Sequence, residues 1–308
     1  MRTVSTTPQQ ADLASPAPEH RTLAELRPGD ELAGVFACVR KDRLATRTGS
    51  PYLSLELRDG TATLPARVFG DADFQAARFE RGELVRVNGR VERFRGELQA
   101  ELSSIRRADP AEADPADFLP VAYRDLDELD GFLEHLAGEV HDRDLGRLLD
   151  SFLGDDDFRA ELRRAPCTRA GHHAYLGGLL EHTVAVTTLA HEACVLHPRL
   201  RPDLLLSAAL LHDIGKTREF TFGAEIGLSE EGRLVGHLAL GHRMVAERST
   251  ALGGFPPDMG LALEHCILGH HGPDALPGRR FGSAEALALH RLNALDASVK
   301  GALEHGLA

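Results

Sequence analysis

The chain has 308 residues, of which 43% are apolar, and a formal net charge of −12. This length suggests two domains of ordinary size, and the apolar content is sufficient to build their cores. No apolar run approaches the ~18 residues needed to span a bilayer, which argues against a membrane protein.

The first 20 residues lack the apolar segment of a signal peptide and are rich in Pro, Ala, Ser and Thr. We therefore expect residues 1–20 to form a disordered tail. The four cysteines, Cys38, Cys167, Cys194 and Cys266, are scattered and show no CxxC spacing. We interpret them as reduced thiols, mostly buried, and predict a cytoplasmic protein.

The negative charge is concentrated in one segment. Residues 21–107 carry a net charge of +3, residues 108–160 carry −12 and residues 161–308 carry −2. Because local fields decide which face a polyanion can approach, the overall acidity does not exclude a nucleic-acid partner.

Residues 21–108 have the alternating pattern of short β-strands. Turn signals such as Arg58-Asp59-Gly60 and Arg95-Gly96 separate five runs: Glu31–Arg40, Tyr52–Leu57, Thr63–Phe69, Leu84–Phe94 and Glu97–Ile105. Five short strands predict a small closed barrel. The segments YLSLELRDGTATLPARVF and GELVRVNGRVERFRGELQAEL resemble the OB-fold of the nucleic-acid-binding, tRNA-anticodon type.

Barrels of this kind bind single strands through a basic groove and aromatic stacking platforms. The candidate contacts are Arg40, Lys41, Arg67, Tyr52 and Phe69, with Arg43, Arg47, Phe36 and Phe94 as further members of the group. In the alternative interpretation the aromatic residues form the barrel core and the arginines form a solvated face.

Residues 109–160 predict an acidic helical linker, with helices around Leu126–Val140 and Leu145–Leu153. From residue 161 to 308 no strand pattern appears, and amphipathic helices are expected at Gly178–Cys194, Asp203–His212, Leu234–Ala251, Pro257–His270 and Ser283–Leu303. The predicted fold class is therefore α+β in two domains, with an N-terminal five-stranded barrel and a C-terminal all-α bundle.

The adjacent pair His212-Asp213 follows an apolar run at the end of a predicted helix. Such a pair can simply cap a buried helix. Further residues of metal-ligating types lie on other predicted helices, most of them on apolar segments where a bare charge or imidazole would be costly: His182, His237, His270, His271 and Asp296.

The order His…His-Asp…Asp resembles the HD-domain metal-dependent phosphohydrolase superfamily, through His182, His212, Asp213 and Asp296. His237 and the His270-His271 pair resemble the expanded HD sites that hold two metals. The segments HHAYLGGLLEHT, LLLSAALLHDIGK, EGRLVGHLALG and ILGHHG, behind a barrel, are similar to the YhaM-type 3′→5′ exoribonucleases over roughly residues 21–305. One departure is Leu292-Asn293, where relatives tend to have Asp-Asn.

By this resemblance, His182, His212, Asp213 and Asp296 hold one metal, and Asp213, His237, His270 and His271 hold the other. Mixed imidazole and carboxylate ligands suit two divalent transition-metal ions, with Mn favoured over Fe, Co, Ni or Zn, whereas Mg prefers oxygen alone.

Asp213, as the bridge, and Lys216, within one turn of it, are the predicted catalytic residues. For Lys216 the alternative is a surface lysine, and the catalytic role is favoured. Arg218, His172 and His173 are predicted to contact the substrate phosphate or terminal ribose. For the two histidines, simple helix capping is the alternative.

The resulting functional hypothesis is a metal-dependent 3′→5′ exonuclease that acts on single-stranded RNA, and also on single-stranded DNA, releasing nucleoside 5′-monophosphates. One alternative is an HD phosphodiesterase or nucleotidase for a small nucleotide such as a cyclic dinucleotide. Another is an OB-fold nucleic-acid-binding protein without activity. The sequence predicts no membrane partner and leaves the oligomeric state open, a homo-oligomer included.

Overall fold

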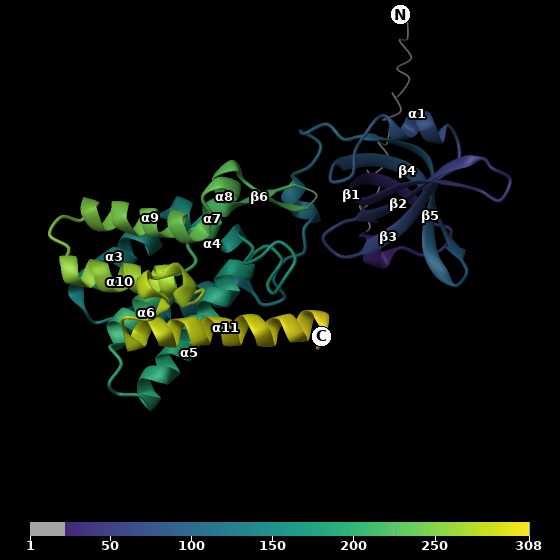
Figure 1. The fold of residues 1–308 in the computed structure, drawn as a ribbon. Helices are drawn as coiled ribbons and strands as arrows, with labels where there is room; N and C mark the ends of the chain where they lie inside the picture. The colour runs from purple at the N-terminus through teal and green to yellow at the C-terminus, as the bar shows by residue number, and fades with distance from the viewer. Residues whose placement is uncertain (1–21, 224, 308) are drawn as a thin grey trace, which may run out of the picture.

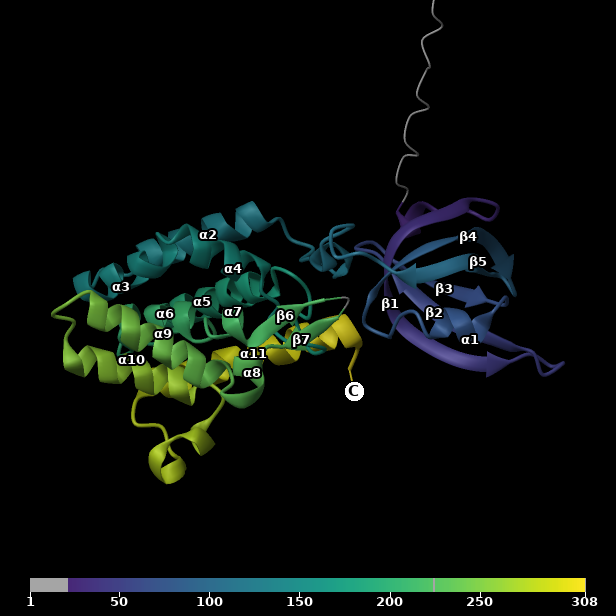
Figure 2. The same cartoon turned by 90° about the horizontal axis from the view of Figure 1, so that it is seen from above.

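The computed structural model describes residues 22–223 and 225–307, which form a β-barrel and a helical domain lying side by side (Figures 1 and 2). The expected two-domain α+β fold is confirmed. The tail of residues 1–20 lies outside the described residues. Among the helices of the described chain, none has both the length and the apolarity to cross a membrane.

Five strands close the barrel in the order β1-β2-β3-β5-β4, and every pair is antiparallel except β3 and β5. They are β1 Glu31–Ala45, β2 Pro51–Arg58, β3 Thr63–Val68, β4 Leu84–Phe94 and β5 Glu97–Arg107. A bulge between Cys38 and Arg40 bends the long β1, so that its first half pairs with β4 and its second half with β2. Alternate residues of the strands fill the barrel interior.

A second bulge, at Asn88 and Gly89 of β4, explains why a glycine stands there. A Cβ atom at Gly89 would overlap the backbone carbonyl of Glu101 and the Cα atom of Leu102 on β5. The missing side chain therefore allows the two strands to cross closely where the barrel curves. The short helix α1, Ala72–Ala76, connects β3 to β4.

The helical domain surrounds one apolar core to which α2, α3, α5, α6, α10 and α11 all contribute. Its longer helices are α2 Leu126–Gly138, α3 Arg143–Leu153, α4 Asp156–Arg164, α5 Gly178–Leu196, α6 Pro202–Leu211, α9 His237–Ala251, α10 Pro257–Gly269 and α11 Ala284–His305. The short helices α7, Lys216–Glu219, and α8, Glu230–Leu234, connect α6 to α9.

The acidic segment of residues 109–160 contributes helices to this core. Leu129, Leu133 and Leu136 of α2 are buried in it, although the sequence treats the segment as a linker. Part of its acidity belongs to helix starts, because Asp125, Asp142 and Asp155 accept hydrogen bonds from the first backbone N–H groups of α2, α3 and α4. Each such cap contributes about 1 kcal/mol to helix stability.

The expectation of an all-α C-terminal region is wrong at one place. Phe220–Phe222 (β6) and Ile226–Leu228 (β7) pair as a two-stranded sheet directly after α7. The alternation in these two segments covers only three residues each, too short for a pattern to be recognised. In Figure 1 this hairpin points toward the barrel.

The hairpin packs on the chain that connects the two domains. Phe220 and Ile226 form a small apolar cluster with Ala116, Leu119 and Leu176. An ion pair of 3.1 Å joins Arg81 of the barrel to Glu225 of the hairpin. The hairpin therefore contacts the barrel, the connecting segment and the helical domain.

Candidate functional site

The pair His212-Asp213 lies at the end of α6, where the backbone leaves the helix and turns into α7. Gly215 lets α9 approach this turn closely, because a Cβ atom there would overlap the carbonyl of His237 and the backbone nitrogen of Gly241 on α9. The glycine thus brings the start of α9, with His237, next to Asp213. Both His212 and Asp213 are buried.

A first cluster consists of His182, His212 and Asp213. The Nε2 atoms of the two histidines are 3.3 Å apart. The Oδ2 atom of Asp213 lies 3.5 Å from Nε2 of His182 and 3.3 Å from Nε2 of His212. Three ligand atoms of the types that bind transition metals therefore converge in the protein interior.

The hydrogen bonds behind this cluster fix the protonation of the two rings. Nδ1 of His212 donates to the carbonyl of Ala209 at 2.7 Å, and Nδ1 of His182 donates to Oδ2 of Asp296 at 2.6 Å. Each neutral ring then presents an Nε2 lone pair to the other. Two facing lone pairs repel unless a cation lies between them, and this arrangement fits a metal.

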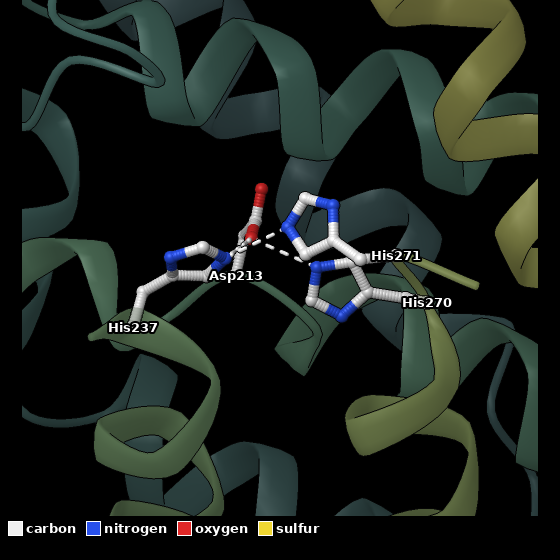
Figure 3. Close-up of side chains that lie close together, drawn as sticks. All are labelled: Asp213, His237, His270 and His271. Carbon is white, nitrogen blue, oxygen red and sulfur yellow. Dashed lines mark hydrogen bonds and ion pairs between the residues drawn. The ribbon is translucent and has the colours of Figure 1, made fainter. Parts of the chain in front are cut away.

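A second cluster gathers three histidines around the other oxygen of Asp213, as Figure 3 shows. Oδ1 of Asp213 lies 3.3 Å from Nε2 of His270 and 3.6 Å from Nε2 of His237. The Nε2 atoms of His237 and His271 are 2.9 Å apart. Nδ1 of His270 donates to the carbonyl of Ile267, which again directs a lone pair toward the carboxylate.

Two atoms of this second cluster lack a hydrogen-bond partner within the described chain, namely Oδ1 of Asp213 and Nε2 of His270. Both are buried acceptors, and leaving such an acceptor unsatisfied costs about 1–3 kcal/mol. A shared divalent cation would satisfy both atoms at once. The residues present therefore fit a metal in the second cluster as well.

The electrostatics of the two clusters favour ligands in their binding form. Burial alone would raise the pKa of Asp213, but the charge of Lys216 holds it well below its usual range. Burial lowers the pKa of His182 and His271 to about 4 and that of His270 to about 3. At neutral pH the carboxylate is charged and these imidazoles are neutral, as metal binding requires.

The structure places Asp296 differently from the expected position of a direct ligand. Its Oδ2 atom accepts from Nδ1 of His182 at 2.6 Å and lies 3.1 Å from Nε2 of His173, on the side of the His182 ring that faces away from Asp213. Here Asp296 orients His182 and fixes its tautomer. The sequence could not distinguish the two positions, because both need a carboxylate close to His182.

His173, a predicted substrate contact, has a buried side chain whose two ring nitrogens face other side chains, and its role toward the substrate stays a prediction. One faces Asp296, and the other lies 2.9 Å from the hydroxyl of Tyr175, which donates to Glu181. Burial opposes a charge on this ring, but Asp296 and Glu181 raise its pKa. Gly178 allows the approach, because a Cβ atom there would overlap the carbonyl of His173.

A cavity of about 460 Å³ opens beside the two clusters. Its lining includes the predicted residues His172, Lys216, His237, His270 and His271, whereas Arg218 is exposed on α7 and does not line it. Lys216 is buried rather than a surface lysine, and its ammonium lies 2.6 Å from Oδ2 of Asp213 and 3.3 Å from Sγ of Cys167. Burial disfavours this charge, but Asp213 raises the pKa of Lys216.

Sequence reasoning missed several residues of the site. Glu219 accepts from Nδ1 of His237 at 3.0 Å, and it could have been suspected because it lies one helical turn after Lys216. Cys167, His290 and Asn293 line the cavity, and nothing in their sequence context sets them apart from ordinary core residues.

Comparison with known proteins agrees with this geometry. The HD domain family model matches residues 179–298, and the model of the OB-fold nucleic acid binding domain matches residues 35–108. The chain is 27% identical over 278 residues to the 3′-5′ exoribonuclease YhaM of Oceanobacillus iheyensis, covering 88% of this chain and 85% of that protein. It is 29% identical over 260 residues to the protein of the same name from Bacillus subtilis, covering 82% and 80%.

The chain is a homologue of the YhaM exoribonucleases. Its HD domain contains both clusters, and an HD domain implies dependence on a divalent metal. The expectation drawn from the resemblance is thus confirmed for the homology, the fold and the dependence on a divalent metal.

The OB-fold presents an aromatic platform, which we define as Tyr52, Arg67, Phe69 and Phe94. The rings of Tyr52 and Phe69 stack with centroids 5.5 Å apart, and the guanidinium of Arg67 lies 4.7 Å from the ring centroid of Phe94. Phe69 and Phe94 are 42% and 40% exposed, far more than core residues. The grouping of these four side chains is typical of a surface that stacks bases.

Other predicted contacts on the OB-fold pack or form polar contacts within the protein. Lys41 donates to the carbonyls of Ala76 and Phe79, and these bonds tie β1 to the end of α1 and the segment after it. Phe36 is buried in the barrel core. Arg43 forms a double hydrogen bond with Asp73, and Arg40 is paired with Asp42 at 2.6 Å, although both arginines are exposed.

Proposed function

We propose that this protein is a metal-dependent 3′→5′ exoribonuclease that hydrolyses single-stranded RNA to nucleoside 5′-monophosphates. The observation that carries the proposal is the buried carboxylate of Asp213, whose two oxygens face two separate groups of histidine nitrogens beside a cavity. The relatives named 3′-5′ exoribonuclease support the direction of cleavage and the substrate.

We assign two divalent ions to the site, with Mn favoured. His182, His212 and Asp213 would hold one, and Asp213, His237, His270 and His271 would hold the other. When bound, two such ions activate water and stabilise the charge that develops on the attacking and leaving oxygens at phosphorus. Asp296 and Glu219 orient His182 and His237 through their Nδ1 atoms, so that each ring presents Nε2.

Lys216 has a catalytic role in this proposal. Its ammonium is buried at the cavity wall and remains charged at neutral pH, because Asp213 raises its pKa. A fixed positive charge beside the scissile phosphate stabilises the non-bridging oxygens as negative charge accumulates. His172, half-buried in the cavity lining and like Lys216 close to Sγ of Cys167, would contact the same phosphate.

The OB-fold would hold the strand upstream of the cut. Base stacking on the aromatic platform tolerates any sequence, because every base has a π-face. This property suits an enzyme that removes nucleotides one after another. It also extends the proposed substrates to single-stranded DNA, for which stacking is equally available. We place the protein in the cytoplasm, since its four cysteines are unpaired thiols.

The test is digestion of a 5′-labelled single-stranded RNA by protein stripped of metal, to which Mn, Fe, Co, Ni, Zn or Mg is returned singly. We expect a ladder that shortens from the 3′ end with Mn, and nucleoside 5′-monophosphates as products. Products with 3′-phosphates, or internal cuts, would contradict the proposal. Cleavage of a cyclic dinucleotide without cleavage of RNA would favour the small-nucleotide phosphodiesterase instead.

A further inference from the structure

The side chain of Asn293 on α11 presents an amide to the wall of the cavity. Asn293 is only 7% exposed and lines the cavity together with His270 and His271. Within residues 22–223 and 225–307, no residue hydrogen-bonds to its side chain. The oxygen and the nitrogen of this amide are therefore both available to a ligand that enters the cavity.

One turn earlier on α11, His290 offers a second polar atom to the same cavity. Its Nδ1 donates to the carbonyl of His270 at 3.0 Å, which leaves a lone pair on Nε2. The neighbouring wall positions are Ala294 and Ala297, whose small side chains leave room for a ligand. This wall therefore offers two acceptors, Oδ1 of Asn293 and Nε2 of His290, and one donor, Nδ2 of Asn293.

We propose that Asn293 and His290 form a subsite for the 2′- and 3′-hydroxyls of the 3′-terminal ribose. The inference rests on the proposed exoribonuclease function and adds the means of recognising RNA. A hydroxyl both donates and accepts, which matches a wall with two acceptors and one donor. Base edges differ among the four nucleotides in their donors and acceptors, whereas every ribonucleotide presents the same diol.

The location of the subsite agrees with this assignment. In 3′→5′ cleavage to 5′-monophosphates, the terminal sugar is attached directly to the phosphate that is cut. Its binding group must therefore lie next to the metal-ligating residues, and His290 is hydrogen-bonded to the backbone of His270 in the second cluster. The cavity volume of about 460 Å³ lies within the ~300–1,000 Å³ typical of sites that enclose one small ligand.

Recognition of the diol predicts a preference for RNA at the terminal nucleotide. A site built to hydrogen-bond a hydroxyl discriminates against the analogue that lacks it, because its own buried polar groups are then left unpaired. The preference should be a property of the last sugar alone, and it should not depend on the sugars bound to the OB-fold.

The test compares three RNA oligonucleotides that differ only at the 3′-terminal sugar, which is ribose, 2′-deoxyribose or 3′-deoxyribose. Each is digested by the wild-type protein, by Asn293→Ala and by the control Asn88→Ala. Asn88 is an exposed barrel asparagine that bonds to Ser104. For the ribose end, we expect Asn293→Ala to lower kcat/KM on the order of tenfold, the size of one or two neutral hydrogen bonds.

The decisive quantity is the coupling between the residue and the hydroxyls. We expect Asn293→Ala to have little further effect on an end that already lacks the hydroxyl it reads, and Asn88→Ala to behave as wild type on all three. Equal losses on all three ends, or no loss on any, would overturn the subsite.

A second measurement separates this inference from the proposed function. Binding of AMP, 2′-deoxy-AMP and 3′-deoxy-AMP to the metal-loaded protein is measured by calorimetry, and it requires no turnover. Absence of RNA cleavage together with AMP binding that depends on Asn293 and a hydroxyl would contradict the nuclease while supporting the subsite. Cleavage of RNA with equal affinities for the three nucleotides would do the reverse. Thermal unfolding of Asn293→Ala near the wild-type temperature shows that the variant is folded.

Discussion

Replacement of Asp296 by Asn tests whether this residue orients a ligand or is itself a ligand. The structure shows Oδ2 of Asp296 accepting from Nδ1 of His182 at 2.6 Å and facing Nε2 of His173 at 3.1 Å. Asparagine has nearly the same shape, but it lacks the charge and can accept through one atom only. We therefore expect the variant to keep the first cluster assembled with a less basic and less firmly held His182.

The expected loss of metal affinity follows from the orienting role of Asp296. Loss of an orienting partner behind a metal-ligating histidine typically costs 10- to 100-fold in metal affinity, or about 1.4–2.7 kcal/mol. Direct coordination by Asp296, as the family resemblance implies, would make the loss larger, because a charged ligand would leave the metal. The second cluster should keep its affinity, since none of its ligands contacts Asp296 among the described residues.

The assay is titration of metal-free protein with Mn²⁺ against a chromophoric chelator, for the wild type, Asp296→Asn and the control Asp150→Asn. Asp150 is an exposed residue on α3, far along the chain from both clusters. We expect two binding equivalents in all three proteins, one of them weakened 10- to 100-fold in Asp296→Asn. Loss of one whole equivalent would show that Asp296 is a ligand, and unchanged affinities would show that it has neither role.

Three further predictions follow from the same structure. Asp213→Asn should abolish hydrolysis and weaken the binding of both metals, whereas His270→Ala should weaken the binding of the second metal only. Elemental analysis after dialysis distinguishes the two variants. Full turnover by Asp213→Asn would show that Asp213 is not the shared ligand. Joint replacement of Tyr52 and Phe69 by Ala should raise KM for long RNA by tens-fold or more, because stacking contributes roughly 1–3 kcal/mol per base. Hydrolysis of the small substrate bis-p-nitrophenyl phosphate should stay intact. An unchanged KM would show that the aromatic platform does not bind the strand. Burial would raise the pKa of Asp59, but the N–H groups of Leu23, Thr61 and Ala62 lower it. The carboxylate therefore stabilises the fold above its unfolded pKa, and this contribution is lost as pH falls through its folded pKa. Unfolding temperatures measured below pH 5 should fall less steeply in Asp59→Asn than in the wild type, and parallel curves would contradict the assignment.

The sequence predicted the strands and helices in which apolar residues recur with a clear period. The strands at Leu84–Phe94 and Glu97–Arg107 alternate apolar and polar residues over most of their length, and the sequence predicts their bounds almost to the residue. The second half of β1, from Lys41 to Ala45, was missed because its polar residues do not alternate with a buried set. α4 was missed because only Phe158 and Leu162 of its nine residues are buried, which is too few for a helical stripe.

The site shows a similar division. Histidine and aspartate on apolar segments indicated the metal clusters, because such residues are expensive to bury without a cation. The position of Asp296 behind His182, rather than beside Asp213, depends on the packing of α11 against α5 and leaves no trace in the spacing. Asn293 was noticed only as part of a departure from relatives at Leu292-Asn293, since an isolated amide on a helix has many ordinary explanations.

The β6–β7 hairpin limits how the two domains can be recombined. Phe220 follows immediately after Glu219, the partner of His237, and it packs on Ala116 and Leu119 of the connecting segment. A chimaera that exchanged the OB-fold at residue 108 would keep this contact, but Glu225 would lose Arg81. An exchange made after Leu119 would expose the apolar side of the hairpin next to a metal-site histidine. Fusion proteins should therefore retain residues 109–121 and supply an arginine at the barrel position that meets Glu225.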